Sequence, residues 1–208
     1  MKKLMTITGS IPDGCAVACS GGADSMALLH FVSRARKNVT AVHVNHGTSH
    51  SLDYESVAAG FCHRNNIKFE VHSWQGDPYE GESLEAFWRK QRIAVFNQYE
   101  TVLTGHNLDD VVEWWLMTGI RGEPKLIPYQ TDNRKKPFLA VSKEEILQYC
   151  ARHDVPFIHD ETNFTGERPR SNIRMNVVPR LLEVNPGLYK EFRKKLSRGC
   201  KSSSDSVG

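Results

Sequence analysis

Short apolar runs alternate with helix-like segments along the first half of the chain, and this alternation restricts the fold more than any other feature. The sequence predicts strands at residues 15–19, 39–44, 67–72 and 101–104, and helices at residues 25–36, 52–64, 83–97 and 108–117. Strands that alternate with helices in this way form a mostly parallel sheet that helices cover on both faces. We therefore expect an α/β protein that binds its ligands at the carboxyl ends of the strands.

The turn after the first predicted strand contains six residues that are suited to holding a phosphate: Ser20-Gly21-Gly22-Ala23-Asp24-Ser25. Two adjacent glycines allow positive φ angles and a close approach of backbone N–H groups to an anion. The helix that follows directs its unpaired N–H groups at the same place. An ordinary strand-to-helix turn with a Ser or Asp cap is the plain alternative for Ser-Gly-Gly alone. The complete six-residue form favours a phosphate site, with Asp24 as a metal-facing carboxylate.

This hexapeptide resembles the PP-loop, Ser-Gly-Gly-x-Asp-Ser, of the ATP pyrophosphatase family, whose members cleave ATP between the α and β phosphates. The resemblance implies a Rossmann-like sheet of the adenine nucleotide alpha hydrolase type, with ATP held by residues 20–25 and Mg²⁺ bound by Asp24. The Walker A spacing occurs nowhere in the sequence. Transfer of a γ-phosphate by a P-loop kinase is therefore disfavoured.

Two further predicted strands end in polar residues. Asn45 and His46 lie at the end of the second strand, and His106 follows the fourth. Because the carboxyl ends of parallel strands meet at one edge of a sheet, these residues converge on the predicted phosphate turn. We expect Asn45 and His46 to line a nucleotide pocket.

The helix predicted at residues 108–117 carries an acidic cluster in its first turns. Asp109 and Glu113 are one turn apart, and like charges at that spacing destabilise an isolated helix by about 0.2–0.5 kcal/mol. Enrichment of acids at a helix N-terminus explains Asp109 and Asp110, but it does not explain Glu113. The cluster therefore favours binding of a cation, either Mg²⁺ or a substrate ammonium.

A charged stripe lies on the helix predicted at residues 83–97, because Glu85, Arg89 and Arg92 recur at one and two helical turns. A salt-bridged surface is the ordinary explanation of such a stripe. Contact with phosphates is the alternative.

Basic residues gather toward the C-terminus. Residues 1–163 contain 17 Lys and Arg against 20 Asp and Glu, whereas residues 164–208 contain 10 against 4, a net charge of +6. Such a segment attracts nucleic acid through counterion release, although a solvated face or a disordered tail has the same composition.

We expect a principal domain at 1–122, a basic helical appendage at 123–200 and a disordered tail at 201–208. The appendage would begin with a polar connection at 123–137 and contain helices at 142–153 and 173–183.

Cysteine spacing and hydropathy place the chain among ordinary intracellular proteins. Its five cysteines match neither a disulfide framework nor a metal or redox pair, so we expect free thiols, with Cys15 and Cys19 on one face of a strand. No apolar run is long enough to span a membrane or to form the core of a signal peptide. We therefore expect a cytoplasmic protein.

The order of the motifs narrows the resemblance to one family, the bacterial tRNA(Ile)-lysidine synthetases. The similarity covers about residues 12–190 and departs from the family pattern at Gly105, at Asn172 and in residues 123–125. Beyond the PP-loop, the matching segments are His43-Val44-Asn45-His46-Gly47, Leu84-Glu85 with Arg89 and Arg92, residues 106–113, Arg121-Gly122, Pro137-Phe138-Leu139, Asp160-Glu161-Thr162-Asn163, residues 170–174, Pro179 and Asn185-Pro186. Members usually carry further C-terminal domains that hold tRNA, so the resemblance implies a short form.

The resemblance implies a ligase that acts in two steps at C2 of the wobble cytidine of tRNA(Ile). ATP adenylates the C2 oxygen while Asp24 and Mg²⁺ assist the departure of pyrophosphate. Lysine then displaces AMP through its ε-amine, which a base such as His106 or Asp109 deprotonates. Asp110 and Glu113 would bind the amino groups of lysine. A monomer or a homodimer would contact tRNA through Arg89, Arg92, Arg170, Arg174, Arg180 and Lys194.

Three alternatives stay open at this point. A PP-loop enzyme that makes 2-thiocytidine shares the ATP chemistry, but it needs a catalytic or cluster-binding set of cysteines. A nucleotide-binding module without catalysis would keep the glycine turn and has no need of the acidic cluster. A compact RNA-binding protein would use the basic C-terminal segment without ATP.

Overall fold

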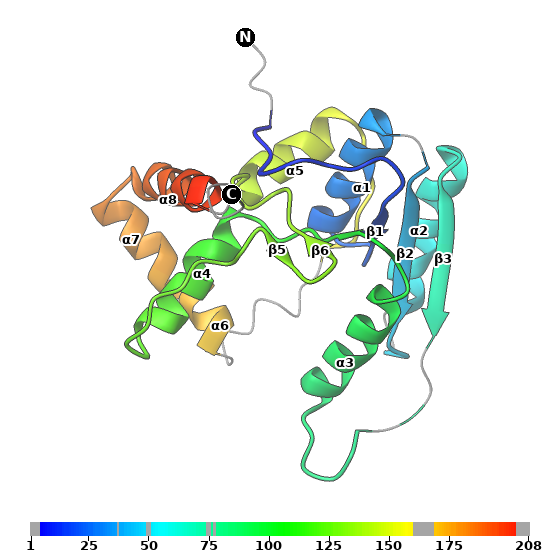
Figure 1. The fold of residues 1–208 in the computed structure, drawn as a ribbon, viewed down its shortest axis with the longest axis horizontal. Coiled ribbons are helices and arrows are strands. Elements are labelled where there is room, and N and C mark those ends of the chain that lie inside the picture. The colour runs from blue at the N-terminus through cyan, green and yellow to red at the C-terminus, as the bar shows by residue number, and fades with distance from the viewer. Residues whose placement is uncertain are drawn as a thin grey trace.

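The computed structural model describes residues 5–36, 38–48, 51–73, 76, 78–159 and 169–202, with side chains through residue 198. Its centre is a sheet in the strand order β3-β2-β1-β4-β6-β5 (Figure 1). The strands are β1 (Ala16–Ala18), β2 (Thr40–Asn45), β3 (Lys68–Ser73), β4 (Val102–Leu103), β5 (Gln130–Thr131) and β6 (Arg134–Lys135). Neighbouring strands are parallel except β5 and β6, which confirms the predicted mostly parallel sheet.

Helices cover both faces of this sheet, as the sequence predicts. They are α1 (Ala23–Ala35), α2 (Ser51–Arg64), α3 (Leu84–Phe96), α4 (Leu108–Gly119), α5 (Lys143–Arg152), α6 (Pro169–Asn172), the π-helical segment η2 (Ile173–Val177), α7 (Val178–Val184) and α8 (Leu188–Ser202). Helices α1, α2 and α5 pack on the face of β1 that carries Val17, and α3 packs on the opposite face against Ala16 and Val102. Successive side chains of β1 reach opposite cores because strand side chains alternate.

The cysteines behave as the sequence predicts wherever their side chains are described. Cys15 and Cys19 flank β1, and both pack into the apolar cluster that contains Val17, so they face the same side of the sheet as expected. Together with Cys62 and Cys150 they are buried, free thiols. These four side chains are packing elements of the core.

A β-hairpin replaces the second half of the polar connection expected at residues 123–137. β6 pairs in parallel with β4, and Arg134 lies opposite Val102. The sequence does not predict this hairpin, because each strand has two residues, too few to show a strand periodicity, and the turn uses Asp132 at φ 51°. The sheet thus continues beyond residue 122, and the part that follows is not purely helical. The predicted domain boundaries stay a prediction.

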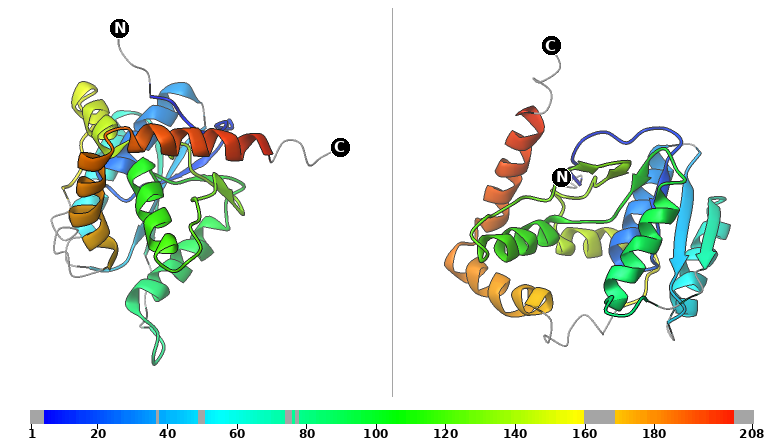
Figure 2. Two further views of the ribbon diagram at one scale, coloured as in Figure 1. Left: turned by 90° about the vertical axis from the view of Figure 1, so that its left-hand side faces the viewer. Right: turned by 60° about the horizontal axis from the view of Figure 1, so that its bottom comes forward.

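The C-terminal helices form a second apolar cluster with α4. This cluster includes Leu108 of α4, Ile173 of η2 and Phe192 of α8. Figure 2 shows α7 and α8 beside α4, on the side of the molecule away from β3. The helix predicted at 173–183 is present, but it starts as the π-helical η2 before it continues as α7. The small helical appendage that the sequence predicts is therefore built on the acidic helix.

Two sequence expectations fall largely on residues that the structure does not describe. Residues 160–168 lie outside the described ranges, and they include the motif Asp160-Glu161-Thr162-Asn163. Of the tail expected to be disordered at 201–208, residues 201 and 202 belong to α8 and the rest lies outside the described ranges. Among the described helices, none has the length and apolar character needed to cross a lipid bilayer.

Candidate functional site

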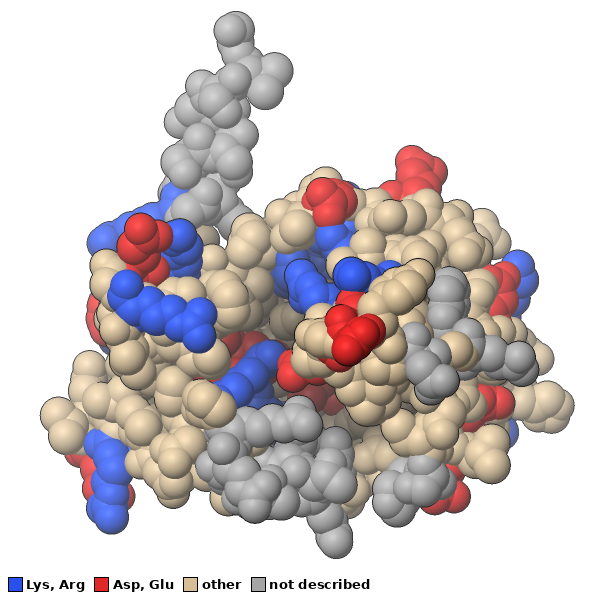
Figure 3. Space-filling view, turned by 90° about the horizontal axis from the view of Figure 1, so that it is seen from below, with Lys and Arg blue, Asp and Glu red and all other residues tan. Residues whose placement is uncertain are grey.

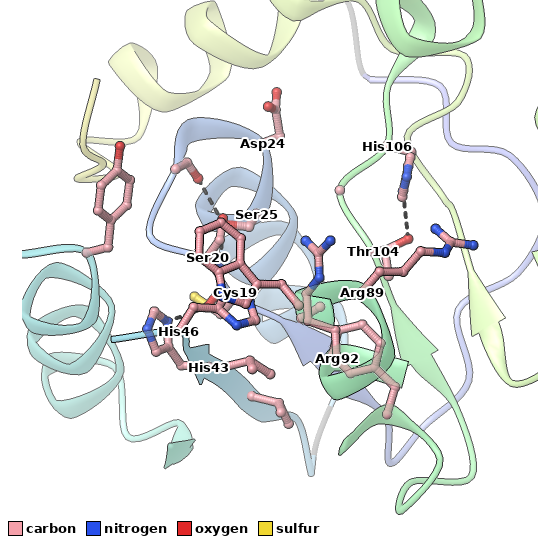
Figure 4. Close-up of a pocket in the computed structure, with 18 of the residues that line it drawn as sticks. Cys19, Ser20, Asp24, Ser25, His43, His46, Arg89, Arg92, Thr104 and His106 are labelled. Carbon is pink, nitrogen blue, oxygen red and sulfur yellow. Dashed lines mark hydrogen bonds between the residues drawn. The ribbon is translucent and has the colours of Figure 1, made fainter. Parts of the chain in front are cut away.

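A cavity of about 1340 Å³ opens at the carboxyl ends of β1, β2 and β4. Residues that the sequence singled out line it from several elements: Ser20, Gly22, Asp24, Ser25, His46, Arg89, Arg92, His106, Asp110 and Arg170. Figure 4 shows Ser20, Ser25 and Cys19 on one side of the cavity, and Arg89, Thr104 and His106 on the other. The convergence of strand-end residues on one edge of the sheet is therefore confirmed for His46 and His106.

The glycine turn forms a compact bend that leaves the first turn of α1 uncapped. The Ser25 hydroxyl accepts a hydrogen bond from the backbone N–H of Ser20 (3.1 Å) and donates one to the carbonyl of Gly22 (2.9 Å). Gly22 is the N-cap residue, so no side chain satisfies the N–H groups at the start of α1. A helix N-terminus with free N–H groups and adjacent hydroxyls is an anion-binding arrangement.

Gly21 makes this bend possible through its backbone rather than through a side-chain contact. It adopts φ 83°, and a Cβ atom built on it would lie 2.5 Å from the backbone carbonyl oxygen of Tyr54. Its own carbonyl accepts a hydrogen bond from the N–H of Ile158 (3.0 Å). The glycine is therefore required by the close approach of α2 as well as by the left-handed φ.

We expect Gly21→Ala to lower the stability of the protein more than Gly14→Ala does. Gly14 also has positive φ (68°), but nothing lies within 4 Å of its built Cβ, so it measures the conformational cost alone. That cost is about 1–2 kcal/mol, and the clash at residue 21 adds about 1–3 kcal/mol. Urea unfolding of both variants measures the difference. Equal destabilisation of the two variants would contradict the packing argument.

The carboxylate of Asp24 is held by two residues from other parts of the chain. The ammonium of Lys143, at the start of α5, donates to both carboxylate oxygens (2.9 and 2.7 Å). The side-chain amide of Asn107 donates to one of them (3.1 Å). Sequence reasoning missed Lys143, because no motif marks it and its contact with Asp24 joins residues 119 positions apart.

The acidic cluster of α4 divides between two environments. Asp110 and Glu113 share the guanidinium groups of Arg170 and Arg174, with Arg174 donating to both carboxylates (2.7 and 2.9 Å). Asp109 instead accepts hydrogen bonds from the Tyr189 hydroxyl (2.6 Å) and the Lys143 N–H (2.7 Å). The expected pair of Asp109 and Glu113 is therefore not the pair that shares a cation.

Glu113 is the most deeply buried member of this cluster. Its side chain is 1% exposed, and burial raises its pKa while Arg170 and Arg174 act in the opposite direction. The cation that the cluster requires is thus supplied from within the chain by two arginines that the sequence assigned to tRNA. Asp110 and Arg170 line the cavity, whereas Glu113 and Arg174 do not.

Burial favours the neutral form of two histidines that line the cavity, His46 and His106. Burial lowers the pKa of His106, and the nearby Lys136 and Arg170 lower it further against the effect of Asp110. Its Nδ1 contacts the Thr104 hydroxyl at 3.0 Å. Burial also lowers the pKa of His46. A neutral imidazole that lines a cavity is able to accept a proton from a substrate.

Some predicted site residues lie away from the cavity. The side-chain amide of Asn45 donates a hydrogen bond to Glu55 (2.7 Å), and its side-chain oxygen accepts one from the N–H of Gly47 (2.8 Å). Asn45 does not line the cavity. Arg180 and Lys194 are exposed on α7 and α8, each in a salt bridge with a glutamate three residues away. Arg89 and Arg92 do line the cavity.

The fold and the site together define an α/β protein with a glycine turn, an uncapped helix N-terminus and a polar cavity at the strand ends. The family model for the PP-loop domain matches residues 2–181, and the chain belongs to this family. This confirms the resemblance that the hexapeptide indicated.

Comparison with curated proteins finds relatives that are longer than this chain. A tRNA(Ile)-lysidine synthase from Lactiplantibacillus plantarum is 33% identical over 193 residues, which cover 84% of this chain and 43% of the relative. The enzyme of the same name from Francisella philomiragia is 30% identical over 210 residues, with 94% and 51% covered. The chain therefore spans about half the length of these relatives, or less.

Comparison with solved structures supports the fold alone. The U34-tRNA thiolase NcsA from Methanococcus maripaludis, solved with its [4Fe-4S] cluster, superposes with a TM-score of 0.70. The sequence identity is 20%, and the match covers 88% of this chain and 70% of the thiolase. The expected Rossmann-like α/β architecture is confirmed.

Proposed function

We propose that this protein is an ATP-dependent tRNA-modifying ligase of the lysidine synthetase type, which joins lysine to C2 of the wobble cytidine of tRNA(Ile). One observation carries the proposal: the uncapped glycine turn, the carboxylate of Asp24 and the neutral His106 line one cavity. Adenylation of the base requires the first two, and attack by an amine requires the third. The similarity to lysidine synthases over most of this chain supports the same reaction.

The glycine turn would hold the phosphates of ATP through the hydroxyls of Ser20 and Ser25 and the first N–H groups of α1. The residues fit a magnesium ion, because Mg²⁺ in nucleotide sites needs one or two carboxylates together with substrate phosphates. Asp24 offers such a carboxylate, and the cation that both of its oxygens contact in this structure is the ammonium of Lys143. Bound Mg²⁺ would supply positive charge to offset the charge on the departing pyrophosphate.

His106 is the proposed base that takes a proton from the ε-amine of lysine. It lines the cavity, and its lowered pKa keeps it neutral at pH 7. Asp109, the other candidate for the base, accepts hydrogen bonds from the Tyr189 hydroxyl and the Lys143 N–H, and it does not line the cavity. The ammonium form of lysine must lose a proton before it attacks, so a neutral base at this position serves the second step.

Asp110 is the proposed contact for an amino group of lysine. It lines the cavity together with Arg170, whose guanidinium lies 3.3 Å from a carboxylate oxygen of Asp110. Glu113 acts through Arg170 and Arg174 and holds them beside α4. We keep Arg180 and Lys194 as proposed contacts to the RNA backbone, since exposed cations fit phosphate binding. A cytoplasmic location and a homodimer also stay predictions.

The alternative of sulfur transfer finds little support in the cysteines. Burial raises the pKa of Cys19 to about 12 and those of Cys62 and Cys150 to about 11, so these thiols stay protonated. Within the residues that the structure describes, no group of three or more His, Cys, Asp or Glu side chains is arranged to hold a metal ion. Buried thiols of this kind are inert.

We expect multiple-turnover release of pyrophosphate only when ATP, Mg²⁺, lysine and a tRNA(Ile) transcript with cytidine at the wobble position are all present. The reason is that lysine must displace AMP from the adenylated cytidine before the enzyme can begin another turnover. A transcript with uridine at that position is the matched control. Steady-state pyrophosphate release without lysine would exclude lysine as the acceptor, and release without RNA would exclude the ligase.

A further inference from the structure

The side of the cavity opposite the glycine turn is formed by four basic residues from two elements. We call them the basic rim: Arg89 and Arg92 of α3, and Arg134 and Lys136 at β6. All four line the cavity. Figure 3 shows blue side chains beside a central hollow on one face of the molecule. The cavity volume, about 1340 Å³, exceeds the roughly 300–1,000 Å³ that suffices for one small ligand, so a second binding region is available.

Lys136 is the least expected member of the rim, because it is a buried cation without a carboxylate partner. It is 8% exposed, and no salt bridge joins it to any carboxylate in the described part of the chain. Its ammonium donates to the Pro128 carbonyl (3.2 Å) and to the Thr131 hydroxyl (3.0 Å). An ammonium has three protons, so one donor is left for a ligand. Burial of a cation is costly unless an anion accompanies it.

Arg89 and Arg92 extend the same region from the other side. Neither forms a salt bridge with a carboxylate among the described residues, which does not fit the salt-bridged surface that is the ordinary explanation of their spacing. Two charged groups act on the exposed guanidinium of Arg92, the like charge of Arg89 and the opposite charge of Glu85. The positive charges of Arg92 and Lys136 both lower the pKa of His106. The two cations therefore lie near the same side chain in the cavity wall.

We propose that the basic rim binds a backbone phosphate of the RNA strand next to the nucleotide that is modified. This rests on the proposed function, because it takes RNA as the substrate. A guanidinium and an ammonium on opposite sides of a phosphodiester match its two free oxygens. The uncapped N-terminus of α1 already offers a place for the phosphates of ATP on the other side of the cavity. The rim thereby brings the target base between the bound nucleotide and His106.

The test measures the affinity for a tRNA(Ile) transcript at several salt concentrations. The variants are Lys136→Met, Arg92→Met and the double variant, with Lys68→Met as control, because Lys68 is exposed and paired with Glu70 at the sheet edge. We expect about tenfold weaker binding for each single variant at low salt. The slope of log affinity against log salt should fall by about 0.7–0.9 per lost contact. Lys68→Met should leave both quantities unchanged.

A second arm separates RNA phosphate from nucleotide phosphate. Calorimetry with α,β-methylene-ATP and Mg²⁺ should give the same affinity for the wild type and for both single variants. Weaker binding of this analogue with an unchanged RNA slope would overturn the proposal and assign the rim to ATP. An unchanged slope in Arg92→Met, whose exposed side chain does not endanger folding, would also overturn it. If the wild type bound no tRNA, the proposed function itself would fail.

Discussion

Asp24→Ala should reduce ATP-dependent release of pyrophosphate by about 100- to 1,000-fold, the loss that follows removal of one preorganised electrostatic group. Asp24 lies in the first turn of α1 and lines the cavity, and Lys143 and Asn107 hold its carboxylate through hydrogen bonds. The alanine variant would lack the carboxylate that lies next to the glycine turn, where Mg²⁺ and the phosphates would be held. A pyrophosphate assay with tRNA and lysine measures the effect.

The loss should be one of chemistry and not of folding. The side chain of Lys143 is 41% exposed, so its ion pair with Asp24 contributes at most about 1 kcal/mol to stability. Asp13→Ala is the matched control, because Asp13 is 79% exposed and forms a salt bridge with Arg36 (3.6 Å). Arg36 lies at the C-terminal end of α1, whereas Asp24 lies at its start. Binding of tRNA should persist in both variants. Near-normal turnover of Asp24→Ala would show that the glycine turn does not have the proposed function.

Replacing Arg170 and Arg174 together by Met should destabilise the protein by about 3 kcal/mol at pH 7. The double variant leaves Glu113, whose side chain is 1% exposed, without the two cations that contact it. Loss of a partner from a buried ion pair costs about 3–5 kcal/mol. Protonation of Glu113 sets a ceiling, because binding a proton at pH 7 from an ordinary pKa of 4.5 costs about 3.4 kcal/mol.

The destabilisation should shrink as the pH falls. In the variant the folded-state pKa of Glu113 lies further above its unfolded value, so the folded protein binds a proton that the unfolded chain releases. The stability from that proton is fully present below pH 4.5 and is lost as the pH rises through the folded pKa. Urea unfolding at pH 5.5 and pH 7 therefore gives a smaller deficit at pH 5.5.

Two further variants make this result specific to the buried carboxylate. Adding Glu113→Gln to the double variant should recover stability at pH 7, because it removes the uncompensated charge. Arg180→Met should cost less than about 1 kcal/mol, since its salt bridge with Glu183 is exposed. A double variant as stable as the wild type at pH 7, with no dependence on pH, would contradict the burial argument.

The regular part of the fold is readable from the sequence because its signals are local. The strand and helix alternation, the glycine turn and the capping box of Ser142 with Glu145 each involve residues within a few positions of one another. The hairpin at residues 130–135 gave no such signal. Its strands have two residues each, and β6 exists because the neighbouring β4 offers hydrogen-bonding groups to it.

The candidate site was predictable in its residue types and less so in its pairings. The sequence indicated a carboxylate at Asp24, a histidine at His106 and a need for a cation near Glu113. It did not indicate that Lys143 contacts Asp24 or that the cation for Glu113 comes from Arg170, 57 positions away. Such partners are chosen by packing between helices, and no spacing rule connects them.

The sequence by itself determined the parallel sheet, the glycine turn and the edge at which the candidate site forms, because backbone periodicity and glycine conformation are local properties. Only the tertiary structure decided which charges meet. The docking of α6 and η2 against α4 gave the acidic helix Arg170 and Arg174, and the pairing of β6 with β4 brought Lys136 into the cavity wall. Charge pairing depends on distances through space, which the order of residues along the chain does not specify.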